Sequence, residues 1–501
     1  MRRLLGSGLL PALLPASALA SVAGEPRIVP VHPGMIAPFV ALLLAIAVFP
    51  FLHRRWWEKN YPLVAIGLGL VTIGYYVGVL DNTPRLLQTA HEYVSFICLI
   101  GSLFVVAGGI HIRIRGRSSP RANVFLLLVG AVLSNLIGTT GASMVLIRPY
   151  LRVNRYRIRP FHVVFFIFIV SNIGGALTPI GDPPLFLGYL KGVPFFWVVQ
   201  ELWFPWMLTV AAVLGVFFLL DTRSYRNLPA GVRREVDAAG EEGQAAGAGN
   251  LLFLAVILVA VFVTDPPFLR EVLMLGAAAG SYATTGRDIH RQNEFNVLPI
   301  KEVALLFFGI FATMIPALDW LQLHAHELGI KTPGQFYWTT GGLSAVLDNA
   351  PTYLNSLSLQ LGLFADEASV REVLRLARSS GAAASGLAEA GPAVRAALEV
   401  LLRTKYELVA AGAVGPEESR IALLLGNHPL HLASISLAAV FFGACTYIGN
   451  GPNFMVKSIA EQSGVRCPSF FAYIAFYVLP VLLPVFTLVW LLFFSPIAVF
   501  H

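Results

Sequence analysis

Two acidic residues stand in apolar stretches of the sequence that also contain helix-breaking residues. Asp182 follows Thr178-Pro179-Ile180-Gly181, and Asp348 precedes Asn349-Ala350-Pro351 at the middle of another apolar stretch. A carboxylate at membrane depth is costly, so it usually marks a proton or ion pathway. Burial favours the protonated carboxyl group and a bound cation favours the ionised one, so a single site can exchange H⁺ for Na⁺. The alternative interpretation is that both residues cap helices, or that Asp182 lies at the membrane interface.

Hydroxyl and amide side chains lie in the same stretches, and hard cations prefer such oxygen ligands. Proline and glycine interrupt helices there, which frees carbonyl groups to bind a cation and helix N-termini to attract an anion. The candidate ion- or substrate-binding residues are Ser134, Asn135, Thr139, Thr140, Ser171, Asn172, Thr178, Asp182, Asp348, Asn349, Thr352, Thr446, Asn450 and Asn453. Within this set we predict Na⁺ binding at Asp182 and Asp348 with Asn135 and Asn349. Individually, Ser, Thr and Asn can also serve only to hold membrane helices together.

The elements that must position these residues are membrane helices. Of the 501 residues, 56% are hydrophobic and 13% are charged, whereas an ordinary soluble domain has about 25% charged residues. This composition excludes a soluble enzyme, a secreted disulfide scaffold and a disordered chain. The apolar spans are residues 35–52, 61–79, 93–110, 123–147, 161–181, 202–220, 251–263, 272–284, 302–320, 336–363, 431–449 and 470–494. Together they predict an all-α polytopic protein of the inner (plasma) membrane, in contact with lipid.

The distribution of arginine predicts a re-entrant hairpin. Arginine is concentrated in loops 53–59, 111–121 and 148–159, and the positive-inside rule places all three in the cytoplasm. Span 123–147 joins two of these loops, so it must enter and leave the membrane on the same face. Its middle is small, polar and glycine-rich, as a hairpin tip inside a membrane protein requires. By symmetry, span 336–363 is expected to be a second hairpin, entered from outside.

The chain contains two related halves. Residues 35–220 and 251–495 give the same series of about five transmembrane helices, a hairpin and an interrupted helix, in opposite orientations. Residues 175–184 align with 443–452 at matching Gly, Ala, Thr, Ile, Gly and Pro positions, and the hairpins match at Asn135 and Asn349. Inverted repeats with interrupted helices are typical of secondary transporters, whose sites lie at the repeat interface.

Two segments lie outside the repeats, and a third is inserted in the second repeat. Residues 1–25 have a charged start, a short apolar run and Ala18-Leu19-Ala20, so they are interpreted as a signal peptide, with a retained N-terminal hydrophobic segment as the alternative. Residues 221–250 are predicted to be a cytoplasmic linker, and residues 365–429 an external insertion.

Other classes of function have little support in the sequence. The three cysteines are too far apart for a disulfide framework or a zinc cluster, and there is no nucleic-acid-binding motif. An intramembrane aspartyl protease needs Gly-x-Gly-Asp, but Pro179 stands where the first glycine belongs, so we expect no enzyme activity. No cofactor is expected beyond the transported Na⁺ and H⁺.

The residues resemble the ion transporter superfamily of arsenite pumps, NhaD-type sodium/proton antiporters and citrate or dicarboxylate carriers. Ser171–Ala176 with Thr178–Asp182, and Ser344 with Asp348–Pro351, look like the pattern of the NhaD-type antiporters and citrate transporters. The resemblance covers residues 35–495. It implies a scaffold domain, a transport domain with two opposed hairpins, elevator-like movement and a homodimer. The carboxylate carriers have Ser-Asn-Thr at both tips, a pattern that neither tip has here.

We therefore predict a sodium/proton antiporter that exports Na⁺ in exchange for H⁺ by alternating access. An acid at each half-site repels anions and suits a small inorganic cation. The alternative is a Na⁺- or H⁺-coupled carrier of citrate or another small carboxylate, and the third candidate is arsenite efflux.

Overall fold

The computed structural model describes residues 27–113, 118–229, 231, 244–263, 266–293, 295–378 and 390–499. The predicted signal peptide and the middle of the predicted linker lie outside these residues. The described chain is almost entirely helical, as its composition predicts. Two three-residue strands, β1 (His111–Arg113) and β2 (Gln244–Ala246), pair antiparallel.

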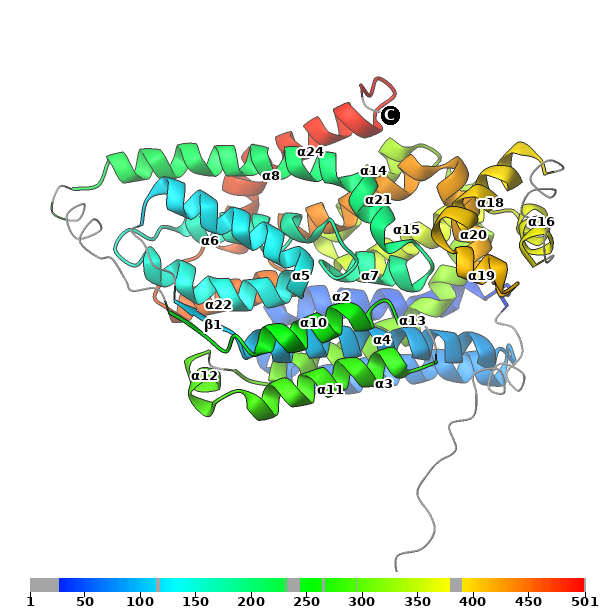
Figure 1. Ribbon diagram of the computed structural model, residues 1–501, viewed down its shortest axis with the longest axis horizontal. Coiled ribbons are helices and arrows are strands. Elements are labelled where there is room, and N and C mark those ends of the chain that lie inside the picture. Colours follow the sequence, from blue (N-terminus) through cyan, green and yellow to red (C-terminus); the bar gives the residue numbers. More distant parts are fainter. Residues whose placement is uncertain are drawn as a thin grey trace, which may run out of the picture.

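The helices form three layers (Figure 1). We call the first the scaffold layer, and it contains α2 (Ala37–Leu52), α3 (Arg54–Gly78), α4 (Thr83–Gly108), α10 (Asn250–Ala260), α11 (Leu269–Thr284) and α13 (Leu298–Leu323), with the short η1 (Pro33–Ile36), α12 (Arg287–Gln292) and η3 (Ala325–Leu328) at its ends. The second, the site layer, contains α5 (Pro120–Val153), α6 (Pro160–Ile169), η2 (Ile173–Gly175), α7 (Pro183–Leu190), α14 (Pro333–Val346), α15 (Asn349–Phe364), α21 (Pro429–Phe442), η4 (Gly443–Cys445) and α22 (Gly451–Gln462).

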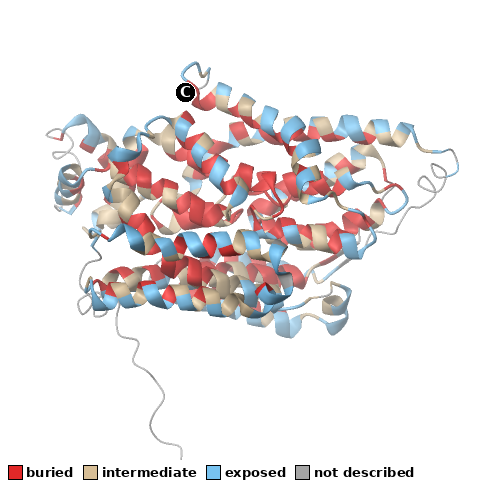
Figure 2. Ribbon diagram, turned by 180° about the vertical axis from the view of Figure 1, so that it is seen from behind, coloured by how far each residue is buried: buried red, intermediate tan, exposed pale blue. Residues whose placement is uncertain are grey.

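The third layer covers the other face of the site layer. It consists of α8 (Phe195–Arg226) and a C-terminal helix built from α23 (Phe470–Tyr473), the π-helical η5 (Ile474–Leu482), α24 (Leu483–Val489) and the π-helical η6 (Trp490–Phe494). Residues buried in the protein are concentrated in the site layer, whereas the outer layers expose one side (Figure 2). Those exposed sides are largely apolar, as contact with lipid requires.

Seven helices in the described part of the chain are long and apolar enough to cross a membrane, or eight if the bent pair α20–α21 counts as one span. All of them coincide with predicted apolar spans. The protein is therefore a polytopic membrane protein. The direction in which each helix crosses remains a prediction from the charge distribution.

The long helix α5 is a hairpin. A straight helix of its 34 residues would extend about 51 Å, yet Asn123 near its start donates a 2.9 Å hydrogen bond to Asn154 at its end. The chain reverses at Gly138, whose φ of 75° and ψ of 157° are non-helical. Such a backbone conformation favours glycine because it has no Cβ. The two ends of α5 therefore lie close together, which is the arrangement that a re-entrant hairpin requires.

The second predicted hairpin consists of α14 and α15. The hydroxyl groups of Thr340 and Ser356, 16 residues apart, lie 2.7 Å from each other, so the two helices run side by side. The helix stops at Leu347 and Asp348, both of which have extended backbone conformations.

Two predicted boundaries can be compared with the structure. The linker was expected to start at Asp221, but α8 continues to Arg226 and buries Asp221 completely. That boundary was wrong because an ion pair lets the helix continue past its apolar run. The insertion forms α16 (Glu367–Arg378), α18 (Pro392–Thr404), α19 (Tyr406–Ala410) and α20 (Pro416–Asn427), which share a small apolar core of their own.

Candidate functional site

Two helices of the site layer begin at equivalent interruptions. Asp182 is the N-cap residue of α7 and Asn450 is the N-cap residue of α22, and each has an extended backbone followed by a proline in the first turn. Proline is favourable there because the first amide groups of a helix have no internal partner. The two residues are 268 positions apart, which is the offset of the predicted repeat. The folded chain brings them into direct contact.

Asp182 is the centre of the site. Its side chain is buried, and its Oδ1 accepts hydrogen bonds from Thr139 Oγ1 at 2.6 Å and from Asn450 Nδ2 at 3.0 Å. Asn349 Nδ2 donates to the other carboxylate oxygen. Thr139 follows the break in the first hairpin and Asn349 follows the break in the second. One carboxylate thus joins both hairpins and both interruptions.

The hydrogen-bond partners of this carboxylate are all neutral. Among the described residues they are Thr139, Asn349 and Asn450, and none of them carries a charge. A buried carboxylate without a basic partner favours protonation or a bound cation, because an isolated buried charge is very costly. A carboxylate in a structural ion pair has a basic partner, whereas the described partners of Asp182 are neutral.

Each hairpin is fastened to its interruption by an equivalent hydrogen bond. Thr178 Oγ1 donates to the carbonyl of Asn135 at 2.6 Å, and Thr446 Oγ1 donates to the carbonyl of Ala345 at 2.7 Å. The two threonines are equivalent by the repeat, so the equivalent of Asn135 is Ala345. The predicted match of Asn135 with Asn349 was therefore wrong.

The neighbouring serines give the same alignment. Ser134 Oγ donates to Val170 O at 2.7 Å, and Ser344 Oγ donates to Ala439 O at 2.6 Å. With Ser134 aligned on Ser344, Thr139 falls on Asn349, and both of these residues donate to Asp182.

Asn135 uses its whole side chain to hold the first interruption. Its amide group donates to the carbonyls of Ala131 and Gly174, and its Oδ1 accepts from the backbone N–H of Leu177 at 2.9 Å. It belongs to the support of the site and makes no hydrogen bond to Asp182.

Asp348 is half-buried and caps α15. Its Oδ1 accepts from the backbone N–H of Ala350 at 3.1 Å, and Thr352 Oγ1 donates to its carbonyl at 2.9 Å. Asp348 is adjacent to Asn349 but does not hydrogen-bond to Asp182. Of the four residues predicted to bind Na⁺, the structure brings Asp182 and Asn349 into contact, whereas Asn135 and Asp348 use their polar atoms on neighbouring backbone.

The remaining candidates connect the two interruptions. Asn172 Nδ2 donates to Asn453 Oδ1 at 2.7 Å, and Asn453 Nδ2 donates to the carbonyls of Gly443 and Thr446, both at 2.8 Å. Asn450 Nδ2 also donates to the carbonyl of Ser171 at 3.0 Å. The hydroxyl of Ser171 lies 2.8 Å from that of Ser143.

A cavity between α4 of the scaffold layer and the first hairpin is lined in part by Asp182. Phe96, Leu99 and Leu103 of α4 form an apolar wall, and the opposite wall contains Thr140 and Asp182. Thr140, which is predicted to bind the ion, thus lines this cavity. The cavity has apolar side chains on one side and the hairpin tip on the other.

Close backbone packing at the first interruption gives a testable prediction. A Cβ added at Gly181 would lie 2.1 Å from Gly175 O, whereas one added at Gly342 of α14 meets nothing within 4 Å. We expect Gly181→Ala to displace Asp182 and abolish transport, and Gly342→Ala to leave it unchanged. Initial transport rates, normalised to the amount of folded protein, measure both. Normal transport by Gly181→Ala would mean that this contact does not position Asp182.

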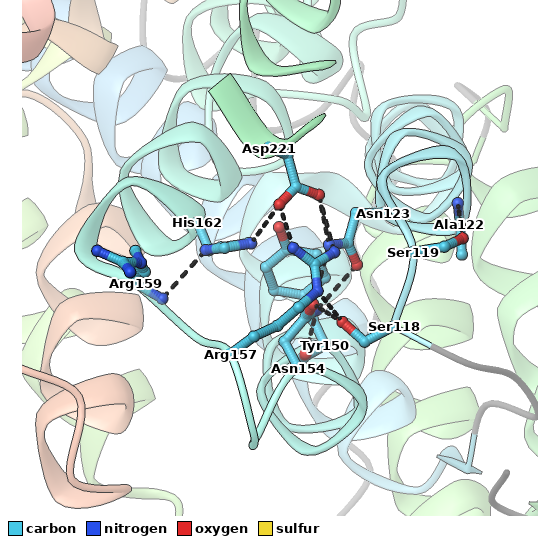
Figure 3. A network of polar contacts seen from close by, with 10 residues as sticks. All are labelled: Ser118, Ser119, Ala122, Asn123, Tyr150, Asn154, Arg157, Arg159, His162 and Asp221. Atoms are coloured by element: carbon cyan, nitrogen blue, oxygen red, sulfur yellow. Dashed lines mark hydrogen bonds and ion pairs between the residues drawn. The ribbon is translucent and has the colours of Figure 1, made fainter. Parts of the chain in front are cut away.

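A second buried polar cluster was missed by the sequence reasoning (Figure 3). Arg157, assigned to a loop, makes two hydrogen bonds to the carboxylate of Asp221, which also accepts from Asn123 Nδ2 at 2.9 Å and lies 3.1 Å from His162 Nε2. The cluster fastens both ends of the first hairpin to α6 and α8. The sequence feature that indicates this cluster is Asp221, an acid directly after the apolar span 202–220, together with the arginine-rich loop 148–159.

Comparison with known proteins agrees with this architecture. Residues 30–494 match a family model described as "putative citrate transport" (CitMHS_2). No individually curated protein matches the chain. The matched range includes both hairpins, both interruptions and Asp182 with its partners. The chain therefore belongs to the CitMHS_2 family of putative citrate transport.

Proposed function

We propose that the protein is a secondary active transporter of the inner membrane that exports Na⁺ in exchange for H⁺ by alternating access. The observation that carries this proposal is the Asp182 carboxylate, buried and held by neutral donors from both hairpins and both interruptions. Protonation and cation binding both neutralise its charge, so each excludes the other. Competition for one carboxylate is sufficient to couple the two ions.

Two buried amide oxygen atoms of the site residues support a cation as the substrate. Asn172 Oδ1 and Asn349 Oδ1 have no hydrogen-bond partner among the described residues. Leaving a buried polar atom without a partner costs about 1–3 kcal/mol. A Cβ added at Gly443 would lie 3.0 Å from Asn172 Oδ1, 3.2 Å from Gly449 O and 3.5 Å from Asn349 Nδ2. Asn172 Oδ1 and Gly449 O therefore face a common space, which the Asn349 amide group also borders. Na⁺ prefers such ligands.

Citrate or another small carboxylate, coupled to Na⁺ or H⁺, is the second candidate. The family description favours it, and the N-termini of α7 and α22 at the site attract negative charge. Against it, the central side chain is itself an acid, and its partners among the described residues include no lysine or arginine.

Everted membrane vesicles loaded with a fluorescent pH probe test the proposal. An inward proton gradient quenches the probe, and Na⁺, Li⁺, K⁺ or citrate is then added separately. We expect dequenching by Na⁺, because Na⁺ displaces H⁺ from Asp182. Vesicles without the protein provide the background. Dequenching by citrate with no response to Na⁺ would replace the antiporter by the citrate carrier.

The equivalence of Asp182 and Asn450 predicts the effect of exchanging them. Asp182→Asn/Asn450→Asp keeps one carboxylate and one amide at the meeting point of the two helices. We expect it to recover on the order of a tenth of the wild-type exchange rate, a loss of about 1.4 kcal/mol. The single variant Asp182→Asn is the control. If the double variant is no more active than this control, the carboxylate must lie on α7 specifically.

A further inference from the structure

A buried ion pair connects the site layer to the scaffold layer. Lys191 Nζ, directly after α7, lies 2.7 Å from Glu92 Oε1 of α4, and the two side chains are 10% and 8% exposed. Two other buried pairs, Arg85–Asp319 and Arg270–Glu271, stay within the scaffold layer. The Glu92–Lys191 pair therefore connects the site layer to the scaffold layer, whereas each of the other two pairs lies within a single layer.

Lys191 and Asp182 lie at opposite ends of the same short helix. Asp182 is the N-cap residue of α7 and Lys191 is its C-cap residue, with eight helical residues between them. The ammonium group is favourable at this end because it faces the negative end of the helix dipole. A single helix of about 12 Å thus connects the candidate ion site to the scaffold contact.

The order of residues along α4 relates the ion pair to the cavity that is lined in part by Asp182. Along α4, Glu92 comes before Phe96, Leu99 and Leu103, which form the apolar wall of that cavity. A second cavity follows around Phe104 and Gly108, further along α4 in the same direction. The charge distribution assigns the end of α4 after Gly108 to the cytoplasm, so the ion pair is on the external side of the site.

We propose that the Glu92–Lys191 ion pair is an external latch that holds α7 against α4 while the site is open toward the cytoplasm. Separating the pair would leave two charges away from water and unpaired, which disfavours departure from this state. The latch must open for α7 and Asp182 to move relative to α4. This inference rests on alternating access by the proposed transporter but not on the identity of its substrate.

Thiol labelling tests the latch without any substrate. Leu103→Cys places a thiol in the apolar wall of the cavity, in a Cys467→Ser background that removes the partly exposed native thiol. In everted vesicles, a membrane-impermeant maleimide reaches this thiol from the cytoplasmic face. We expect Glu92→Gln and Lys191→Met each to lower the labelling rate several-fold. The reversed pair, Glu92→Lys/Lys191→Glu, should restore it.

A matched control separates a latch from general loosening of the structure. Asp319→Asn removes a pair of similar burial that lies inside the scaffold layer, and it should leave the labelling rate unchanged. Unchanged labelling in Glu92→Gln, or an equal decrease in Asp319→Asn, would overturn the latch. If a single variant does not fold, the reversed pair Glu92→Lys/Lys191→Glu provides the test. A latch requires the thiol in this double variant to be labelled at the wild-type rate, and slower labelling would overturn it. These labelling results do not depend on Na⁺ exchange, so a failure of the proposed antiport would not change them.

Discussion

Asp182→Asn is expected to reach the membrane in normal amounts and to exchange no Na⁺ for H⁺ above the background of empty vesicles. The variant removes the charge of the carboxylate that Thr139, Asn349 and Asn450 contact. Without it, these three neutral donors surround no group that protonation and Na⁺ binding both neutralise. Probe dequenching in everted vesicles measures the loss.

The fold should tolerate this substitution. The new amide oxygen can still accept from Thr139 and Asn450, and Asn349 can rotate its amide so that its unpartnered Oδ1 accepts the new N–H. A symmetrical gel-filtration peak in detergent is the check on folding. Exchange at the wild-type rate by well-folded Asp182→Asn would contradict the proposed antiporter.

Asp348→Asn provides a comparison at the neighbouring acid. Asparagine is as good an N-cap residue as aspartate, so the substitution keeps the contact with Ala350 while removing the charge. We expect a smaller loss of exchange than in Asp182→Asn. Complete loss in a folded Asp348→Asn protein would instead make Asp348 an equal partner in ion binding, as the sequence predicts.

The largest effect on stability is expected from Asp221→Asn. The side chains of Arg157, His162 and Asp221 are all completely buried, so the variant leaves the Arg157 guanidinium without its counter-charge. Breaking a buried pair from one side typically costs about 3–5 kcal/mol. We expect less folded protein and a clearly lower apparent unfolding temperature in detergent.

An exposed pair provides the control for this prediction. Glu367 lies 2.6 Å from Arg420 but is 67% exposed, and surface pairs contribute little because water screens them. Glu367→Gln should unfold at nearly the wild-type temperature. If Asp221→Asn is equally stable, the cluster in Figure 3 does not fasten the first hairpin to α8.

Much of the architecture is determined locally, and the sequence therefore predicts it. Lipid requires long apolar helices whose backbone groups are satisfied internally, so hydropathy locates the spans. Gly138 and the Leu347-Asp348 break lie where glycine or polar residues interrupt those spans. Asp182 is identifiable from the sequence as a site residue for two reasons: Pro183 and Pro184 interrupt the helix next to it, and an acidic side chain is unfavourable in contact with lipid.

Tertiary structure alone decided which polar groups meet. Asp182 and Asn450 are 268 residues apart, and no local pattern specifies that Thr139, rather than Asn135, donates to the carboxylate. Likewise, Arg157 and Glu92 have the sequence context of loop and interfacial charges, yet both are buried in ion pairs. Hydropathy reports the average environment of a segment, whereas a hydrogen bond depends on the packing of several segments to within a few tenths of an ångström.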